Sequence, residues 1–146
     1  MMRISTRGRY ALRIMIDLAR YAAREPVSLR DVAARQQITP KYMESIMAML
    51  LRAGLVTSAR GKSGGYRLAR PAAQYNAYEI LCAAEGDLEP VQCLSSPVNT
   101  CPMRERCTTL PVWTGLSEVI RTYLEGISLA DLTSSAAGEM SYCDGI

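Results

Sequence analysis

Apolar residues recur at steps of three and four positions in three stretches of the chain, which is the spacing of one face of an α-helix. The first stretch spans residues 9–24, with apolar positions at Leu12, Met15, Ile16, Ala19 and Ala23. The second spans residues 40–53, with a stripe of Met43, Ile46, Met47 and Leu50. The third begins at Pro111, with a stripe of Val112, Leu116, Val119, Ile120, Tyr123 and Leu124. The pattern therefore predicts three amphipathic helices.

Capping signals mark a shorter helix between the first two stretches. Ser28 precedes Asp31 by three positions, which is an N-cap with a carboxylate in the first turn, and it predicts a helix over 29–36. Thr39-Pro40 starts the next helix, because proline at the first helical position lacks only an N–H that would have no partner there. Two short helices joined by so tight a connection form a helix-turn-helix.

A β-hairpin is predicted directly after the helix-turn-helix. Residues 55–58 and 66–69 have the composition of short strands, and the glycine-rich segment "RGKSGG" between them is their turn. A helix-turn-helix followed by a basic hairpin is a winged helix. The letters "GKS" also resemble the end of a phosphate-binding loop, but Val56 stands where that motif requires glycine, so a nucleotide site is not favoured.

The remaining elements are a helix, a loop, a long helix and a tail. Asn76 with Glu79, and Ser128 with Asp131, repeat the capping pattern and predict a helix over 77–85 and a last short turn. Residues 87–108 lack periodicity and are predicted to be a loop. The apolar stripe of the helix from Pro111 could be core, but the domain before it is already complete, so we interpret it as a dimer seam. Residues from 134 onward are predicted to be a flexible tail.

Three of the five cysteines lie in the predicted loop. They are Cys93, Cys101 and Cys107, in the stretch "CLSSPVNTCPMRERC", and the chain contains no histidine. Clustered thiols in a polar loop indicate an iron–sulfur cluster, a disulfide switch or, less favoured because CxxC pairs are absent, a structural zinc site. Packing alone explains such a cluster poorly. Cys82 falls on a predicted helix and is interpreted as a buried structural cysteine, and Cys143 in the tail as a free thiol.

Charge is distributed unevenly along the chain. Residues 1–70 contain 14 Lys and Arg against 4 Asp and Glu, whereas residues 71–146 contain 3 against 10. A basic first half of this kind favours a polyanionic partner. The odd number of cysteines, the absence of a signal peptide and the absence of a long apolar run predict a cytoplasmic protein without a membrane segment. No histidine, nucleophile motif or cofactor motif points to an enzyme, and an electron carrier would leave the basic half unexplained.

The combined motifs resemble those of the Rrf2 family of bacterial transcriptional regulators. The similarity is carried by the opening "MRISTRGRYALRIMIDLA", by "ITPKYMESIMAMLLRAGLVTSARGKSGGYRLAR", and by the three cysteines followed by a Trp-bearing helix. The resemblance implies a mainly α fold, a winged helix-turn-helix with a small hairpin wing and a long C-terminal dimerisation helix. It divides the chain into a DNA-binding domain (1–86), a cysteine loop (87–109), dimerisation and terminal helices (110–133) and a tail (134–146).

The resemblance also implies the residues that contact a pseudo-palindromic, double-stranded operator. The family's major-groove contacts fall on Thr39, Lys41, Tyr42 and Ser45, and Glu44 occupies a position that tunes which bases are accepted. The wing arginine that enters the minor groove matches Arg60, and Lys62 is expected to approach phosphates beside it. Arg3 and Arg7, in the basic N-terminal segment, are also expected near phosphates.

In many members of the family an iron–sulfur cluster controls a homodimeric regulator, and the three cluster ligands match Cys93, Cys101 and Cys107. The fourth ligand departs from the family pattern. Leu110 stands where one branch has histidine, and Arg9 where another has an acidic residue. The local alternatives are Glu85, Asp87, Glu89 or Glu105, a small thiol or water. A [4Fe–4S] cluster is therefore favoured over [2Fe–2S], because it tolerates one iron without a protein ligand more readily, and a metal-free thiol switch is the alternative.

Overall fold

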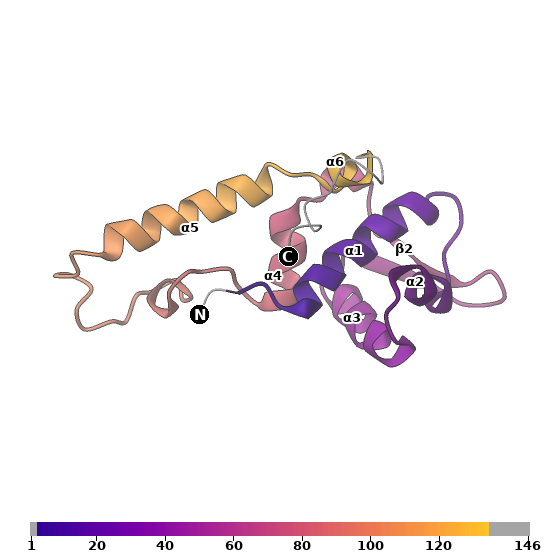
Figure 1. Cartoon of the computed structure of the whole chain (residues 1–146), viewed down its shortest axis with the longest axis horizontal. Coiled ribbons are helices and arrows are strands. Elements are labelled where there is room, and N and C mark those ends of the chain that lie inside the picture. The colour runs from indigo at the N-terminus through magenta and orange to yellow at the C-terminus, as the bar shows by residue number, and fades with distance from the viewer. Residues whose placement is uncertain (1–2, 135–146) are drawn as a thin grey trace.

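The computed structural model describes residues 3–134, which fold into helices and one hairpin (Figure 1). The helices are α1 (Thr6–Tyr21), α2 (Leu29–Gln36), α3 (Pro40–Arg52), α4 (Ala77–Glu85), α5 (Leu110–Glu125) and α6 (Leu129–Ser134). The strands are β1 (Val56–Ala59) and β2 (Gly65–Leu68), and two short 3-10 turns are η1 (Ala72–Gln74) and η2 (Gln92–Leu94). The mainly helical fold with a small hairpin is the one predicted. The predicted tail beyond Ser134, with Cys143, lies outside the described residues.

The predicted caps are confirmed. The Ser28 hydroxyl accepts a hydrogen bond from the backbone N–H of Asp31 at 3.1 Å, and Thr39 caps α3 in the same way. Asn76 and Glu79 form a reciprocal capping box at the start of α4. These signals are local, since each cap satisfies N–H groups that the first helical turn leaves without partners. Local chemistry is therefore sufficient to place the starts of α2, α3 and α4.

The buried face of α1 differs from the predicted one by about one position. The fully buried apolar residues of the helix are Ala11, Ile14, Met15 and Leu18, and the C-cap residue Ala22 is buried as well. Of the predicted stripe only Met15 is fully buried, whereas Leu12, Ile16 and Ala19 flank the core and Ala23 is exposed. Both stripes have helical spacing, and the choice between them is made by the elements that pack on α1, chiefly α4 and α6. For α3 the predicted stripe is confirmed as buried.

The wing is held close to the body of the domain. β1 and β2 pair antiparallel from Val56 opposite Leu68 to Ala59 opposite Gly65, one residue from the predicted bounds of each strand. Val27, before α2, exchanges two backbone hydrogen bonds with Tyr66, at 2.9 and 2.7 Å. A Cβ on Gly65 would overlap the backbone of Val27, so this close approach requires glycine.

Tyr75 joins the base of the wing to the C-terminal elements. Its buried hydroxyl donates to the carbonyl of Leu55 at 2.6 Å and accepts from the N–H groups of Ala69 and Arg70. Its backbone carbonyl accepts from the N–H of Leu129, a fully buried residue at the start of α6. The chain therefore returns to the DNA-binding half after α5, and α6 packs against α1.

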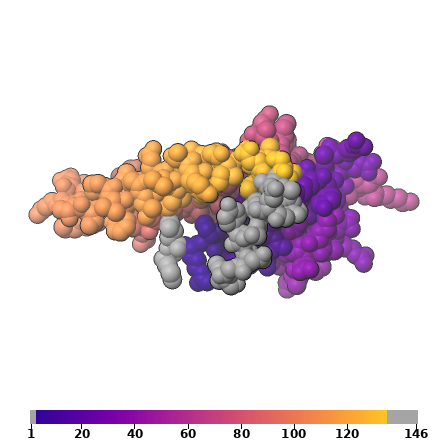
Figure 2. Space-filling view, turned by 45° about the horizontal axis from the view of Figure 1, so that its top comes forward, coloured from indigo at the N-terminus to yellow at the C-terminus, as the bar shows by residue number. Residues whose placement is uncertain are grey.

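Residues 87–125, here called the arm, project from the rest of the molecule (Figures 1 and 2). The arm consists of the cysteine loop and α5, and α5 has no fully buried residue. Its apolar stripe stays open, with 59% of Val112, 64% of Val119 and 69% of Tyr123 exposed. None of the helices in residues 3–134 combines the length and hydropathy that a membrane span needs.

Candidate nucleic-acid interface and cysteine loop

The first two turns of α3 present a polar face. Thr39, Lys41, Glu44 and Ser45 are exposed and Tyr42 is half-buried, while the apolar residues of the same helix face the core. The N-terminal turns of a second helix in a helix-turn-helix are the part that enters the major groove. The structure therefore places the five predicted helix positions on one accessible face.

The start of α1 lies against this face. Ser5, Thr6 and Arg7 line a surface hollow together with Tyr42 and Ser45 of α3. The structure thus brings Arg7 beside the candidate reading residues, although they lie far apart in the sequence. Arg3 is exposed but lies elsewhere, at the edge of an apolar hollow formed with α4 and α5.

A glutamate of α4 forms hydrogen bonds with the N-cap residue of α1. The sequence analysis did not predict this contact. Glu85 Oε1 accepts from both the N–H and the hydroxyl of Ser5, at 3.0 and 2.6 Å, and the hydroxyl accepts from the N–H of Gly8. A Cβ on Gly8 would overlap Glu85 Oε1. The only signal in the sequence was a serine followed by glycine three positions later, and nothing local pointed to Glu85.

The wing turn supplies the second basic element of the interface. Arg60 and Lys62 are exposed, and neither forms an ion pair with a carboxylate of the described residues. Arg67 on β2 is exposed as well. Such cations remain available for phosphates or for a narrow minor groove.

The structure keeps the cysteines of the loop free and half-buried. Cys93 lies in η2, Cys101 follows a turn closed by Asn99, and Cys107 precedes α5. Within residues 3–134, no three His, Cys, Asp or Glu side chains stand close enough together to hold a metal ion. Three cysteine thiolates are the donors that iron–sulfur clusters use, so the residue types fit such a cluster. The loop in this conformation does not bring the three sulfurs together.

The surroundings of Cys107 favour the thiolate form of its side chain. Its sulfur lies 3.5 Å from the Thr109 hydroxyl, and this contact, with the backbone N–H groups of Thr109 and Leu110, lowers the pKa of the thiol. The Trp113 indole N–H donates to the same hydroxyl at 3.3 Å, which leaves the hydroxyl proton for the sulfur. A thiol stabilised as thiolate is both a better ligand and a better nucleophile.

We expect Thr109→Val to slow alkylation of Cys107 several-fold at neutral pH. Removing the hydroxyl raises the pKa of the thiol, so less thiolate is present at any pH below that pKa. Iodoacetamide labelling followed by peptide mass spectrometry measures Cys107 separately from the other thiols. Thr108→Val, at an exposed neighbouring position, is the matched control and should label at the wild-type rate. Equal rates in both variants would contradict the assigned contact.

Each carboxylate predicted as an alternative fourth ligand already has a partner. Glu85 and Glu89 accept hydrogen bonds from serine hydroxyls, Asp87 accepts from the N–H of Glu89, and Glu105 lies 3.6 Å from Arg104. Cys82 was predicted to be buried, but it is only half-buried. Burial nevertheless raises the pKa of its thiol, which suits an inert structural role.

Comparison with known proteins identifies the family. The Rrf2 family profile, described as an iron-dependent transcriptional regulator, matches residues 4–135. The chain belongs to the Rrf2 family.

Relatives within the Rrf2 family cover most of the chain. ORF2 of Azotobacter vinelandii, which bears the name of an HTH-type transcriptional regulator, is 42% identical over 91% of this chain and 80% of its own length. The regulator IscR of Xenorhabdus nematophila is 36% identical over 92% of this chain and 80% of its own. The structure of CymR, the global cysteine regulator of B. subtilis, has a TM-score of 0.74 and 33% identity, and the match covers 92% of this chain and 98% of CymR.

Membership of the Rrf2 family gives the chain a coarse function. Rrf2 proteins are dimeric DNA-binding transcriptional regulators, and the relatives are named as regulators and not as enzymes. The names point to two kinds of signal, since the Rrf2 profile is described as iron-dependent and CymR as a cysteine regulator.

Proposed function

We propose that the chain binds a pseudo-palindromic operator as a homodimer, and that an iron–sulfur cluster on Cys93, Cys101 and Cys107 controls this binding. The observation that carries the DNA-binding part is the juxtaposition of Arg7 with the polar face of α3. A short helix flanked by cations is the arrangement in which phosphate contacts fix register and a few side chains read bases.

The division of roles follows from side-chain chemistry. Lys41 donates to guanine acceptors, Glu44 selects bases by accepting from cytosine N4, and Thr39, Tyr42 and Ser45 complete the reading face. Arg60 enters the minor groove, and Arg7 and Lys62 contact phosphates, whereas Arg3 lies outside this surface, at the hollow beside α4 and α5.

The dimer forms through α5, whose open stripe of Val112, Leu116, Val119 and Tyr123 has no cover within the described part of the chain. In a two-fold symmetric dimer both subunits bury the same surface patch, here the stripe of α5. Two recognition helices then meet half-sites whose centres lie about 34–36 Å apart, or a multiple of that.

The three cysteines of the loop hold the cluster. When bound, an iron–sulfur cluster supplies irons that respond to O₂, nitric oxide or iron supply, most readily where one iron lacks a protein ligand, which favours [4Fe–4S] over [2Fe–2S] here. The surrounding loop has one short 3-10 turn as its only helix or strand, so few contacts oppose its rearrangement around a bound group.

Two contacts can transmit the state of the loop to the DNA interface. Glu89 accepts a hydrogen bond from Ser117 of α5 at 2.5 Å, which ties the start of the loop to the dimer helix. Glu85, just before the loop, holds Ser5 and with it the first turn of α1 that carries Arg7. A change of order in the loop thus reaches both the spacing of the two subunits and the N-terminal contacts to DNA.

A metal-free thiol switch on the same scaffold is the second candidate. The observation in its favour is Cys107, whose pKa is lowered by Thr109 and whose thiolate is therefore prone to oxidation. Similarity to CymR, a cysteine regulator, supports this alternative. Iron and sulfide content separates the two candidates.

We expect Lys41→Ala to weaken binding to an operator selected from random DNA by about 1–3 kcal/mol. Arg60→Ala should weaken binding as well and lower the slope of log affinity against log salt by about one. Fluorescence anisotropy over a range of salt concentrations measures both. Arg104→Ala removes the same charge from the arm, at the opposite end of the molecule from the wing (Figure 1), and should leave binding unchanged. Equal losses in all three variants would contradict the proposed interface.

A further inference from the structure

A run of side-chain contacts connects α1 to the exposed face of α3. Tyr10 and Arg13 lie three positions apart on α1, and the Arg13 guanidinium lies 5.0 Å from the centroid of the Tyr10 ring. The Tyr10 ring in turn meets the Tyr42 ring of α3 edge-on, with the two centroids 5.8 Å apart and the ring planes at 65°. These distances are those of a cation–π contact and of an edge-to-face aromatic pair.

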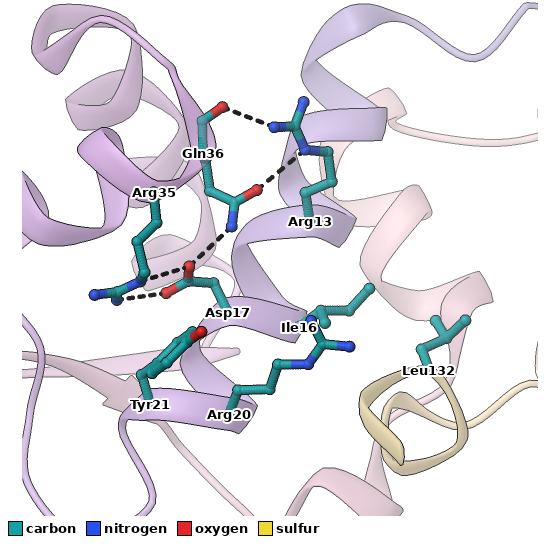
Figure 3. Close-up of a pocket in the computed structure, with 8 residues that line it drawn as sticks. All are labelled: Arg13, Ile16, Asp17, Arg20, Tyr21, Arg35, Gln36 and Leu132. Atoms are coloured by element: carbon teal, nitrogen blue, oxygen red, sulfur yellow. Dashed lines mark hydrogen bonds and ion pairs between the residues drawn. The ribbon is translucent and has the colours of Figure 1, made fainter. Parts of the chain in front are cut away.

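Hydrogen bonds to the end of α2 fix the Arg13 side chain (Figure 3). Arg13 Nε donates to Gln36 Oε1 at 3.1 Å, and Arg13 Nη2 donates to the Gln36 backbone carbonyl at 2.7 Å. Gln36 is the last residue of α2, and its side-chain amide donates to the buried Asp17 at 2.8 Å. The guanidinium therefore cannot leave the Tyr10 ring without breaking two hydrogen bonds to Gln36.

Tyr42 lies next to open space as well as next to Tyr10. It lines the surface hollow that it shares with Arg7 and Ser45. Both tyrosine rings are half-buried and pack against the hydrophobic core. A tyrosine on a helix has more than one low-energy rotamer, and a hollow beside it leaves room for a second one. The contact with Tyr10 therefore favours one orientation of the Tyr42 side chain.

We propose that Tyr10 and Arg13 are positioning residues for the reading of bases by Tyr42, an inference that rests on the proposed function. Tyr10 holds the Tyr42 ring, and Arg13, fixed by Gln36, holds the Tyr10 ring. A side chain kept in its binding orientation loses less conformational freedom when it meets its base pair, so the correct base pair is bound more tightly. Tyr10 and Arg13 thus add to operator selectivity without a contact to DNA of their own.

Anisotropy titrations with a set of operators, each changed at one base pair, test the positioning role. The base pair read by Tyr42 is the one at which Tyr42→Leu loses selectivity. We expect Tyr10→Leu to lose about fivefold of the selectivity at that same base pair, which is the size of effect that an edge-to-face pair supports. Tyr10→Phe keeps the ring and should keep the selectivity. Loss at no base pair, or at a different one, would overturn the proposal.

A double-mutant cycle separates positioning from direct contact with DNA. If Tyr10 acts through Tyr42, Tyr10→Leu should lower operator affinity no further in a chain that already carries Tyr42→Leu. Losses that add in the double variant would show that Tyr10 acts independently of Tyr42 and would overturn the proposal.

Arg13→Gln tests the other positioning residue without changing the core, because Arg13 is exposed. We expect a loss of about threefold in selectivity at the base pair read by Tyr42. The slope of log affinity against log salt should stay at the wild-type value, and a slope lower by about one would assign Arg13 to a phosphate and overturn its positioning role. Arg24→Gln, the same change at an exposed arginine outside α1, is the matched control and should behave as wild type.

The same titrations distinguish this inference from the function on which it rests. A wild-type protein that binds no DNA would overturn the proposed function, and the positioning role with it. A wild-type protein that binds its operator selectively, together with Tyr10→Leu and Arg13→Gln variants of equal selectivity, would overturn the positioning role alone.

Discussion

Replacing Arg35 by alanine is expected to lower the free energy of unfolding by about 3 kcal/mol. Asp17 is completely buried, whereas the Arg35 side chain is 30% exposed, and the two are joined by two hydrogen bonds. Without Arg35 the carboxylate stays buried with only Gln36 as a donor. The hydrogen bond with Asp17 also raises the pKa of Arg35, which keeps the guanidinium charged. The large effect comes from the orphaned carboxylate and not from the intrinsic strength of the pair.

Urea denaturation of three variants measures this effect. Arg30→Ala removes an exposed arginine from the same helix and should cost less than 1 kcal/mol. Adding Asp17→Asn to Arg35→Ala removes the buried charge and should recover part of the loss. A loss below 1 kcal/mol in Arg35→Ala would show that Asp17 reaches water or another cation.

Tyr75→Phe is expected to cost about 3 kcal/mol through a single oxygen atom. The hydroxyl joins three backbone groups, the carbonyl of Leu55 and the N–H groups of Ala69 and Arg70, at 2.6, 3.0 and 3.1 Å. Phenylalanine keeps the ring under the Arg70 guanidinium, which lies 4.1 Å from the ring centroid, but removes the acceptor of the Arg70 N–H and leaves the Leu55 carbonyl and the Ala69 N–H only their mutual hydrogen bond at 3.2 Å. Because these groups flank the wing, its base should loosen more than the rest of the domain.

Denaturation together with hydrogen exchange tests this expectation. The amides of Ala69 and Arg70 should exchange faster in Tyr75→Phe than in the wild type. Tyr21→Phe is the matched control, because 58% of Tyr21 is exposed and its loss of a hydroxyl should change stability little. Unchanged stability in Tyr75→Phe would mean that water replaces the hydroxyl at the base of the wing.

The sequence was sufficient where structure depends on neighbours in the chain. Ser28, Thr39 and Asn76 cap helices through atoms within three residues, so α2, α3 and α4 begin where predicted. The apolar stripe of α3 was also predicted, since only one face of that helix carries large apolar residues. On α1 two adjacent stripes have helical spacing, and packing against α4 and α6 decides between them.

Contacts between distant residues could not be predicted in the same way. The pairs Asp17 with Arg35 and Ser5 with Glu85 have no spacing signature, because they depend on how whole helices cross. The reading residues of α3 were predicted from the family resemblance, and the structure adds that Arg7 lies beside them. The three cysteines were predicted as ligands by type and order, but a loop without regular hydrogen bonding has no single conformation that sequence can specify.

The measurement that tests the central claim most directly is iron and sulfide analysis, with a visible spectrum, of the full chain purified without oxygen. The proposal predicts a coloured protein with about four irons and four sulfides per chain, or about two of each if the smaller cluster forms. Cys101→Ala should lose most of both, and Cys82→Ala, the matched control on α4, should keep them. A colourless wild-type protein without iron, or a full cluster in Cys101→Ala, would contradict the cluster assignment.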